Sequence, residues 1–211
     1  MKQNYQLMLD RLIEAECADG RRPTLLLHAC CAPCSSYVLE YLSQHFAITL
    51  FFYNPNISPR EEYDFRAAEL VRLVEEMGLS EQISVLYGDY DPQVFPDMAK
   101  GLEALPEGGG RCKKCYALRL EESARVAAEQ RFDFYTTTLS ISPHKNAEWL
   151  NEIGDEMGAH YGVRYLTSDF KKKNGYKRSC ELSVQYGLYR QNYCGCIFSK
   201  QAAERKTRET E

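Results

Sequence analysis

Seven of the nine cysteines fall into three short motifs, and these are the residues best suited to chemistry. They are Cys30, Cys31 and Cys34 in HACCAPC, Cys112 and Cys115 in RCKKC, and Cys194 and Cys196 in YCGC. Thiolate sulfur is a soft ligand that favours zinc or iron–sulfur clusters over magnesium. One tetrahedral zinc or one cubane cluster needs four ligands, so seven sulfurs are a surplus. The sequence therefore predicts either two metal centres or one centre beside a redox-active thiol pair.

The first motif lies where α/β proteins bind ligands. HACCAPC follows the apolar run Thr24–His28, which is typical of a buried strand, and Pro33 suits the start of a helix expected over residues 35–44. Ligands bind at the carboxyl ends of strands in open sheets, and a helix N-terminus favours the thiolate form of cysteine. A purely structural role is the alternative, but three cysteines close together in a loop count against it.

The other two motifs leave more alternatives open. The CxxC pair of Cys112 and Cys115 precedes a helix expected over residues 116–130. Such a pair can hold zinc, hold part of an iron–sulfur cluster or form a reversible disulfide. In YCGC, Gly195 permits unusual backbone angles, so both sulfurs could turn toward one site. They could then act as ligands or as a thiol pair that cycles through a disulfide.

Two polar segments are further candidates. In SPHK, His144 could donate a proton and Lys145 could bind a phosphate, with a solvated loop as the alternative. KKKNGYKR is the most basic stretch and a candidate contact for an RNA backbone; its cations are Lys171, Lys172, Lys173, Lys177 and Arg178. The formal net charge of −4 argues against broad electrostatic binding of nucleic acid, but it is compatible with one local contact.

The elements that must position these residues alternate between strand and helix. Strands are expected over residues 24–28, 47–53, 83–87, 132–139 and 163–166, with helices over 35–44, 61–77, 116–130 and 147–157. An N-terminal helix that carries Cys17 and a helix-like stretch over residues 180–191 are also expected. Strands separated by helix-length segments predict an α/β fold with an open, mostly parallel sheet flanked by helices. We expect a single catalytic domain over residues 1–199 and a frayed, polar C-terminal tail over residues 200–211.

Composition excludes several classes of protein. With 44% hydrophobic and 27% charged residues the chain is typical of a soluble globular domain. No apolar run approaches the roughly 18 residues of a membrane span, and the N-terminus has no signal-peptide character. We therefore expect a cytoplasmic protein without a membrane partner. In a reducing compartment, clustered cysteines more often bind metal or do redox chemistry than form structural disulfides.

In combination, the motifs resemble those of one family. LLLHACCAPC, FYNPNI, Tyr63 and Arg66 in a YxxR pattern, RCKKCY, TTLSISPHKN and YCGC together resemble the QueH type of epoxyqueuosine reductase over about residues 24–199. The resemblance implies a fold related to the nucleotide-binding PP-loop or HUP-like domains, with HACCAPC in place of the phosphate loop. It also implies the last step of queuosine biosynthesis, the cobalamin-independent, two-electron deoxygenation of epoxyqueuosine at the wobble position of tRNA.

The resemblance further implies a 4Fe–4S cluster, an adjacent iron or zinc ion, and an electron donor that the sequence does not identify. We hypothesise that Cys112 and Cys115, with Cys31 or a neighbour, hold the cluster. Cys30, Cys34 and one cysteine of the YCGC pair, Cys194 or Cys196, would then serve the second metal or the thiol couple, and His144 could be the catalytic proton donor. In some relatives the position of Cys34 looks to be an aspartate, which suits a metal ligand better than a nucleophile.

Three competing interpretations remain at this point. A zinc-binding RNA-modification or adaptor protein would use the cysteines structurally and would be colourless, whereas a cluster protein is brown. An ATP-using PP-loop enzyme would need a glycine- and serine-rich phosphate loop, and HACCAPCSS supplies cysteines and a proline instead. A thiol oxidoreductase that used only the CxxC pair would leave HACCAPC unexplained.

Overall fold

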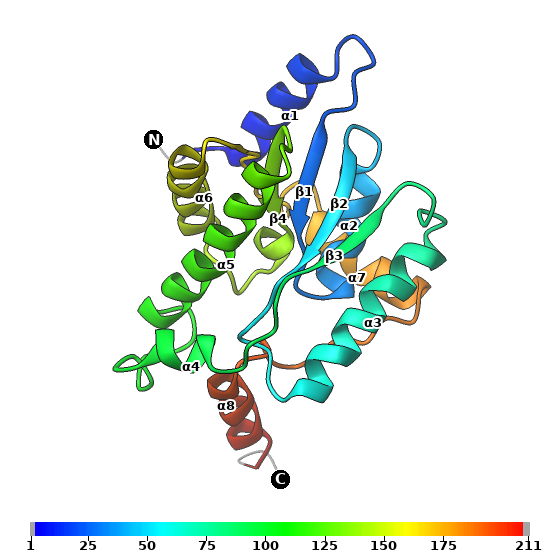
Figure 1. Cartoon of the computed structure of the whole chain (residues 1–211). Coiled ribbons are helices and arrows are strands. Elements are labelled where there is room, and N and C mark those ends of the chain that lie inside the picture. Colours follow the sequence, from blue (N-terminus) through cyan, green and yellow to red (C-terminus); the bar gives the residue numbers. More distant parts are fainter. Residues whose placement is uncertain (1–2, 209–211) are drawn as a thin grey trace.

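Five parallel strands form the centre of the computed structural model, which describes residues 3–208 (Figure 1). The sheet has the order β3-β2-β1-β4-β5, and every neighbouring pair is parallel. The strands are β1 (Thr24–His28), β2 (Ala47–Phe52), β3 (Ser84–Tyr87), β4 (Phe134–Thr137) and β5 (Arg164–Tyr165). Parallel sheets need cover on both faces, which explains why the central strands β1 and β2 are apolar runs. The predicted α/β class is confirmed.

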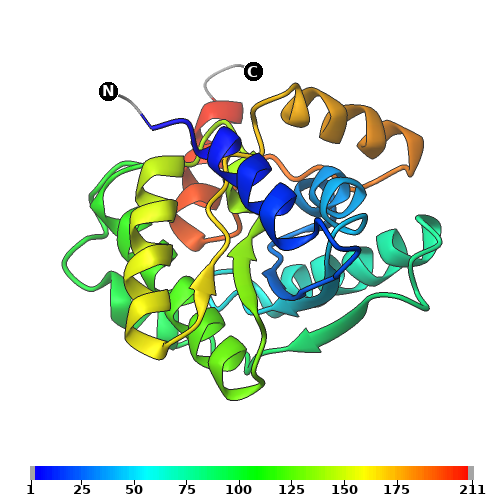
Figure 2. The same cartoon turned by 90° about the horizontal axis from the view of Figure 1, so that it is seen from above.

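The alternation of side chains along β1 separates two apolar layers. Leu25 and Leu27 pack on one face of the sheet and Leu26 on the other, as successive residues of a strand must. The first layer contains α1 (Tyr5–Glu16), α2 (Ala32–Leu42) and α3 (Arg60–Glu76), and the second contains α5 (Gly110–Glu129) and α6 (Ala147–Tyr161). The view from above shows the helices distributed around the sheet (Figure 2). A further helix, α7 (Gly175–Gln185), packs on α2.

The strand order creates a crevice beside the cysteine motif. From β1 the chain moves outward to β2 and β3, and it then crosses to β4 and β5 on the other side of β1. His28 and Thr137 are register partners at the carboxyl ends of β1 and β4. Ligands bind at such a reversal of strand order, because the two following loops diverge there. HACCAPC follows one of these strands.

Several elements begin or end at residues other than those expected. Helix α2 begins at Ala32 rather than at residue 35, since Pro33 fits the first turn, and Cys34 therefore lies inside the helix. Helix α5 begins at Gly110 rather than at residue 116, so RCKKC belongs to its first turns and not to the preceding loop. Strand β4 ends at Thr137, where the side chain accepts a hydrogen bond that opens the 3-10 turn Thr138–Ile141.

Two helices were not expected from the sequence. They are α4 (Val94–Ala99) and α8 (Ile197–Arg208). The segment after Ser199 was expected to be frayed, but it is helical as far as Arg208, and residues 209–211 lie outside the described part of the chain. Phe198 anchors this helix by packing on Phe95 of α4, with ring centroids 6.1 Å apart. Among residues 3–208, no helix is long and apolar enough to cross a membrane.

Candidate functional site

The cysteines of HACCAPC form a compact group of sulfur atoms. The Sγ atoms of Cys30, Cys31 and Cys34 all lie within 4.8 Å of one another, and those of Cys30 and Cys31 are 3.7 Å apart. In a tetrahedral site with metal–sulfur bonds of about 2.3 Å, two ligand sulfurs lie roughly 3.8 Å apart. The spacing therefore suits one metal ion shared by these three sulfurs.

The thiols of this group differ in pKa. Hydrogen bonds from Cys30 and Cys34 hold the pKa of the Cys31 thiol well below its ordinary value, while the same contacts raise the pKa of Cys34. Cys31 is also the N-cap residue of α2, where the helix dipole favours negative charge. Both effects favour the thiolate form of Cys31, which is the form of sulfur that binds metal.

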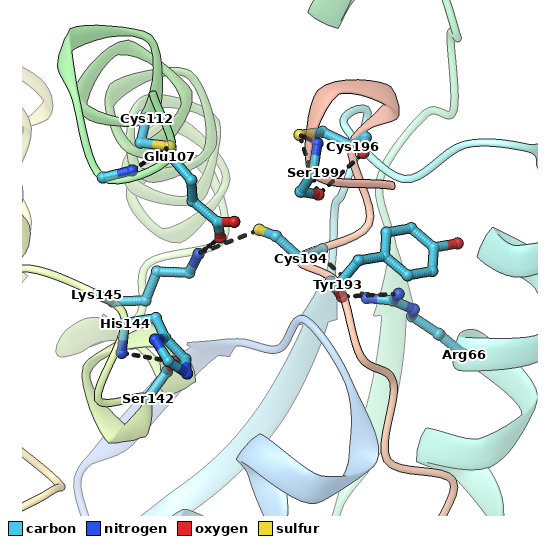
Figure 3. A network of polar contacts seen from close by, with 11 residues as sticks. Arg66, Glu107, Cys112, Ser142, His144, Lys145, Tyr193, Cys194, Cys196 and Ser199 are labelled. Atoms are coloured by element: carbon cyan, nitrogen blue, oxygen red, sulfur yellow. Dashed lines mark hydrogen bonds and ion pairs between the residues drawn. The ribbon is translucent and has the colours of Figure 1, made fainter. Parts of the chain in front are cut away.

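Four further cysteines line one narrow cavity next to this group: Cys112, Cys115, Cys194 and Cys196. Cys112 and Cys115 lie three residues apart on α5 and thus on one face of it. Burial raises the pKa of Cys115 to about 11. The Cys112 sulfur accepts a hydrogen bond of 3.3 Å from the backbone N–H of Gly108 (Figure 3). The structure thus brings the RCKKC and YCGC motifs to one cavity, a grouping that the sequence analysis did not specify.

The YCGC loop is held in place by a buried arginine. Arg66 of α3 has a side chain that is 2% exposed, and it donates hydrogen bonds to the carbonyl oxygens of Cys194 (3.2 Å) and Tyr193 (3.5 Å) (Figure 3). Glu62 balances its charge at 2.7 Å. Gly195 has a φ of +116°, which permits the turn that its neighbours need. The YxxR motif therefore positions the two cysteines.

Lys145 and His144 point to different places although they are adjacent. The Lys145 side chain is 7% exposed, and its Nζ lies 3.2 Å from the Cys194 sulfur and 3.6 Å from the Glu107 carboxylate (Figure 3). Burial lowers the pKa of Lys145, but Cys194, Tyr116 and Glu107 together outweigh this effect, so the pKa is raised overall. Lys145, predicted to bind phosphate, thus lies against a thiol. His144 is exposed.

A larger cavity of about 420 Å³ lies beside the narrow one. Cys30, Cys34 and His144 contribute to its wall. Arg119, Tyr176 and Arg190 also line it, and none of these three was predicted from the sequence to be a site residue. Its volume is in the range of small-molecule pockets. Glu107, Arg119, Lys145 and Cys194 border both cavities. The two sulfur groups are therefore neighbours, and one side of each faces the space that is open to a ligand.

Of the cavity residues Arg119, Tyr176 and Arg190, only Arg119 could have been identified from its spacing in the sequence. It follows Cys115 by four residues on one helix, so the CxxCxxxR spacing places all three side chains on the same face. Tyr176 and Arg190 come from the stretch after residue 169, where the regular alternation of strands and helices ends. Local spacing there gives no indication of which side chains reach the cavity.

Most cations of KKKNGYKR are held by acidic residues of the chain. Lys171 pairs with Asp169 at 2.9 Å, Lys173 with Asp10 at 2.6 Å, and Arg178 with Glu40 at 2.7 Å. Lys172 and Lys177 are exposed. Within residues 3–208, none of the five lines either cavity. The stretch lies at the start of α7 and not in the sulfur site.

Comparisons with known proteins point to one family. The family described as epoxyqueuosine reductase QueH matches residues 25–202. A protein of that name from Streptococcus pyogenes serotype M1 is 42% identical over 200 residues, which is 94% of this chain and 78% of the relative. One from Staphylococcus epidermidis is 45% identical over 94% of this chain and 85% of its own length. One from Thermotoga maritima is 35% identical over 83% of this chain and 90% of its own length.

Proposed function

Because the chain belongs to the QueH family of epoxyqueuosine reductases, we propose that it converts epoxyqueuosine to queuosine at the wobble position of tRNA with a 4Fe–4S cluster and an adjacent metal ion. Family membership makes it an oxidoreductase of queuosine biosynthesis. The observation that carries the cofactor proposal is that seven sulfurs lie in two neighbouring groups, and that every one of these cysteines except the buried Cys31 lines one of two adjoining cavities. The tRNA substrate places the reaction in the cytoplasm.

The distances favour a particular division of the sulfurs. Each cysteine ligand of a cubane binds a different iron atom, so the ligand sulfurs lie farther apart than sulfurs that share one ion. The 3.7 Å between Cys30 and Cys31 suits one shared ion. We assign the iron or zinc ion to Cys30, Cys31 and Cys34, with its fourth position open. This differs from the division hypothesised from the sequence, in which Cys31 or a neighbour joins Cys112 and Cys115.

The cluster then falls to the cysteines of the narrow cavity. Cys112, Cys115, Cys194 and Cys196 supply the four sulfurs that a cubane needs. The competing assignment gives Cys194 and Cys196 a separate role as a dithiol that cycles through a disulfide. The contact of Lys145 with Cys194 fits both, since an ammonium group stabilises either a ligand thiolate or a nucleophilic one.

The reaction requires two electrons and two protons for each epoxide that becomes an alkene, and it releases water. When bound, a cluster supplies single electrons, and a metal ion with an open position polarises the epoxide oxygen. The chain's own contribution is to bind the base in the larger cavity and to deliver protons there. His144 lies in the cavity wall and is the proposed donor. Lys145 lies where the two cavities meet, and its raised pKa keeps it protonated there.

Two further features support the proposal. The strand order 3-2-1-4-5 is the order of the first five strands of nucleotide-binding domains, which supports a relation to the PP-loop fold. Lys172 and Lys177 are exposed cations on the first turns of α7 and its preceding loop. We propose that these two, rather than the ion-paired members of the stretch, contact the tRNA backbone.

Turnover tests this function directly. The loaded chain would be incubated without oxygen with tRNA that contains epoxyqueuosine and with a chemical reductant, and the digested nucleosides would then be analysed. We expect queuosine to form in proportion to the enzyme, and tRNA without the epoxide to stay unchanged. Absence of queuosine from an incubation with fully loaded enzyme contradicts the proposal.

A further inference from the structure

Arg119 is a buried cation at the border between the two cavities. It lies on α5, one turn after Cys115, and is 1% exposed. Its Nε donates a hydrogen bond of 3.2 Å to the carbonyl oxygen of Cys115. Its Nη2 has no hydrogen-bond partner among residues 3–208. A buried polar group without a partner is costly, so this N–H group calls for a partner that the protein chain itself does not supply.

Two other buried arginines near the site show the contrast. Arg111 donates through Nη1 to the carbonyl oxygens of residues 102, 103 and 105, and thereby ties the preceding loop to α5. Arg66 is balanced by Glu62 and by the carbonyls of the YCGC loop. Arg66 thus has partners for Nε and both Nη atoms, and Arg111 has three for Nη1, although its Nε lacks a partner among the described residues. Arg119 is the one of these three whose Nη2 lacks such a partner among the described residues and whose side chain also borders both cavities.

The groups that interact electrostatically with Arg119 are mainly cysteine sulfurs. Burial lowers the pKa of Arg119, but the Cys115, Cys194 and Cys30 sulfurs act against it, so the pKa is raised overall. These sulfurs come from all three cysteine motifs. A guanidinium group stays protonated in proteins, and a buried charge needs an opposite charge nearby. The neighbouring sulfurs would supply this charge when they bind a metal as thiolates.

We propose that Arg119 is a positioning residue that supplies the fixed positive charge of the metal site, with Nη2 donating a hydrogen bond to a sulfur of the bound cluster. The inference rests on the proposed function because it requires the cluster. Reduction adds negative charge to a cluster, and a nearby cation with an N–H donor stabilises the reduced form in a low-dielectric site. Arg119 would therefore raise the reduction potential and ease electron delivery to the substrate cavity.

The test compares cluster reduction potentials by anaerobic redox titration, followed by absorption or electron paramagnetic resonance. Arg119→Met removes the charge and the donors at similar volume, whereas Arg119→Lys keeps the charge. Arg125→Met is the matched control, because Arg125 lies on the same helix but is half-exposed and paired with Glu122 and Glu129. We expect Arg119→Met to lower the equilibrium constant for reduction at least tenfold, about 59 mV for one electron. Arg119→Lys should recover part of the loss, and Arg125→Met should match the wild type.

The other possible results either support or overturn the proposed role of Arg119. A loaded Arg119→Met variant with the wild-type potential overturns the inference. If Arg119→Met does not take up iron and sulfide while Arg119→Lys does, the requirement for positive charge is supported. If neither variant takes them up although both are folded by circular dichroism, the site needs the arginine shape and the charge proposal fails. A wild-type chain that assembles no cluster contradicts the proposed function itself, and is distinguished by its iron and sulfide content.

Discussion

The Nζ atom of Lys145 lies 3.2 Å from the sulfur of Cys194, although 49 residues separate them in the sequence. The Glu107 carboxylate approaches the same ammonium group at 3.6 Å, so a buried lysine is enclosed by a sulfur and an acid. An adjacent ammonium group stabilises the thiolate form of cysteine, which is both the metal ligand and the nucleophile. The contact therefore concerns reactivity and not only packing.

Removing this ammonium group should make Cys194 less reactive. In metal-free protein at neutral pH, we expect Lys145→Met to slow alkylation of Cys194 by iodoacetamide roughly tenfold, because the thiolate loses its stabilising charge. Mass spectrometry of peptides resolves Cys194 from the other cysteines. Lys113→Met is the control, since Lys113 lies at the surface 3.9 Å from Glu152. Equal alkylation rates in Lys145→Met and wild type would mean that the contact does not activate the thiol.

Arg66 should contribute to stability through the YCGC loop. Arg66→Met leaves the half-buried Glu62 and two carbonyl oxygens without their donor, and we expect a loss of roughly 2–4 kcal/mol in the free energy of unfolding. Arg60→Met on the same helix removes an exposed pair with Asp64 and contacts with the Tyr63 and Tyr90 rings, and should cost clearly less than Arg66→Met. Urea denaturation of metal-free protein measures both. Similar values for the two variants would contradict the role given to Arg66.

His28 should make the folded state sensitive to acid. Burial, followed by the nearby Arg119 charge, lowers the pKa of His28 to about 4 from its ordinary value of 6.5. Its Nε2 donates to the Tyr53 carbonyl at 3.0 Å, which leaves Nδ1 to accept from the Thr137 hydroxyl at 2.8 Å. Between these two pH values the unfolded chain binds a proton that the folded chain does not. This contribution to stability is therefore complete above about pH 6.5 and is lost as the pH falls toward 4.

The expected size of this loss is on the order of 3 kcal/mol, from 1.36 kcal/mol for each pKa unit. Unfolding of metal-free protein by urea at a series of pH values would measure it. His28→Gln should flatten the dependence between pH 6.5 and 4, whereas His160→Gln, an exposed histidine at the end of α6, should not. A slope that is unchanged in His28→Gln would exclude His28 as its source.

The exposed lysines of KKKNGYKR should affect tRNA binding more than the paired ones. Each phosphate contact that is lost lowers the steepness of the salt dependence by about one unit. We expect Lys172→Ala with Lys177→Ala to weaken binding and flatten this dependence. Lys173→Ala should have less effect, because Lys173 is held by Asp10 at 2.6 Å. Fluorescence anisotropy with labelled tRNA at several salt concentrations measures both, and unchanged binding in the double variant would remove the stretch from the interface.

Features carried by adjacent residues could be predicted from the sequence. The run Thr24–His28 is a strand as expected, and the cysteines that follow it are brought together because the loop and the first turn of α2 are contiguous. The alternation of strands and helices predicts the α/β class for the same reason. The start of α5 was placed six residues too late, because glycines next to RCKKC suggest a loop although the helix begins at the last of them.

Features that depend on distant contacts could not be predicted. The link from Arg66 to Cys194 spans 128 residues, and no local pattern indicates it. The order of strands, which sets the crevice between β1 and β4, follows from packing and not from any one strand. Helix α8 looked like a charged tail because its anchoring contact, Phe198 on Phe95, joins segments that are about a hundred positions apart.

The central claim is that two neighbouring sulfur groups hold two different metal centres, and metal and sulfide content after anaerobic reconstitution tests it most directly. We expect four sulfides and five metal ions in each wild-type chain, as one cluster and one further ion. Cys112→Ser should lose the sulfide and the brown colour but keep one metal ion, whereas Cys34→Ser should keep the cluster and lose the single ion. Cys17→Ser, which changes a cysteine packed against the core, should match the wild type. A Cys112→Ser variant that keeps its full sulfide content, or a Cys34→Ser variant that loses it, would contradict the division.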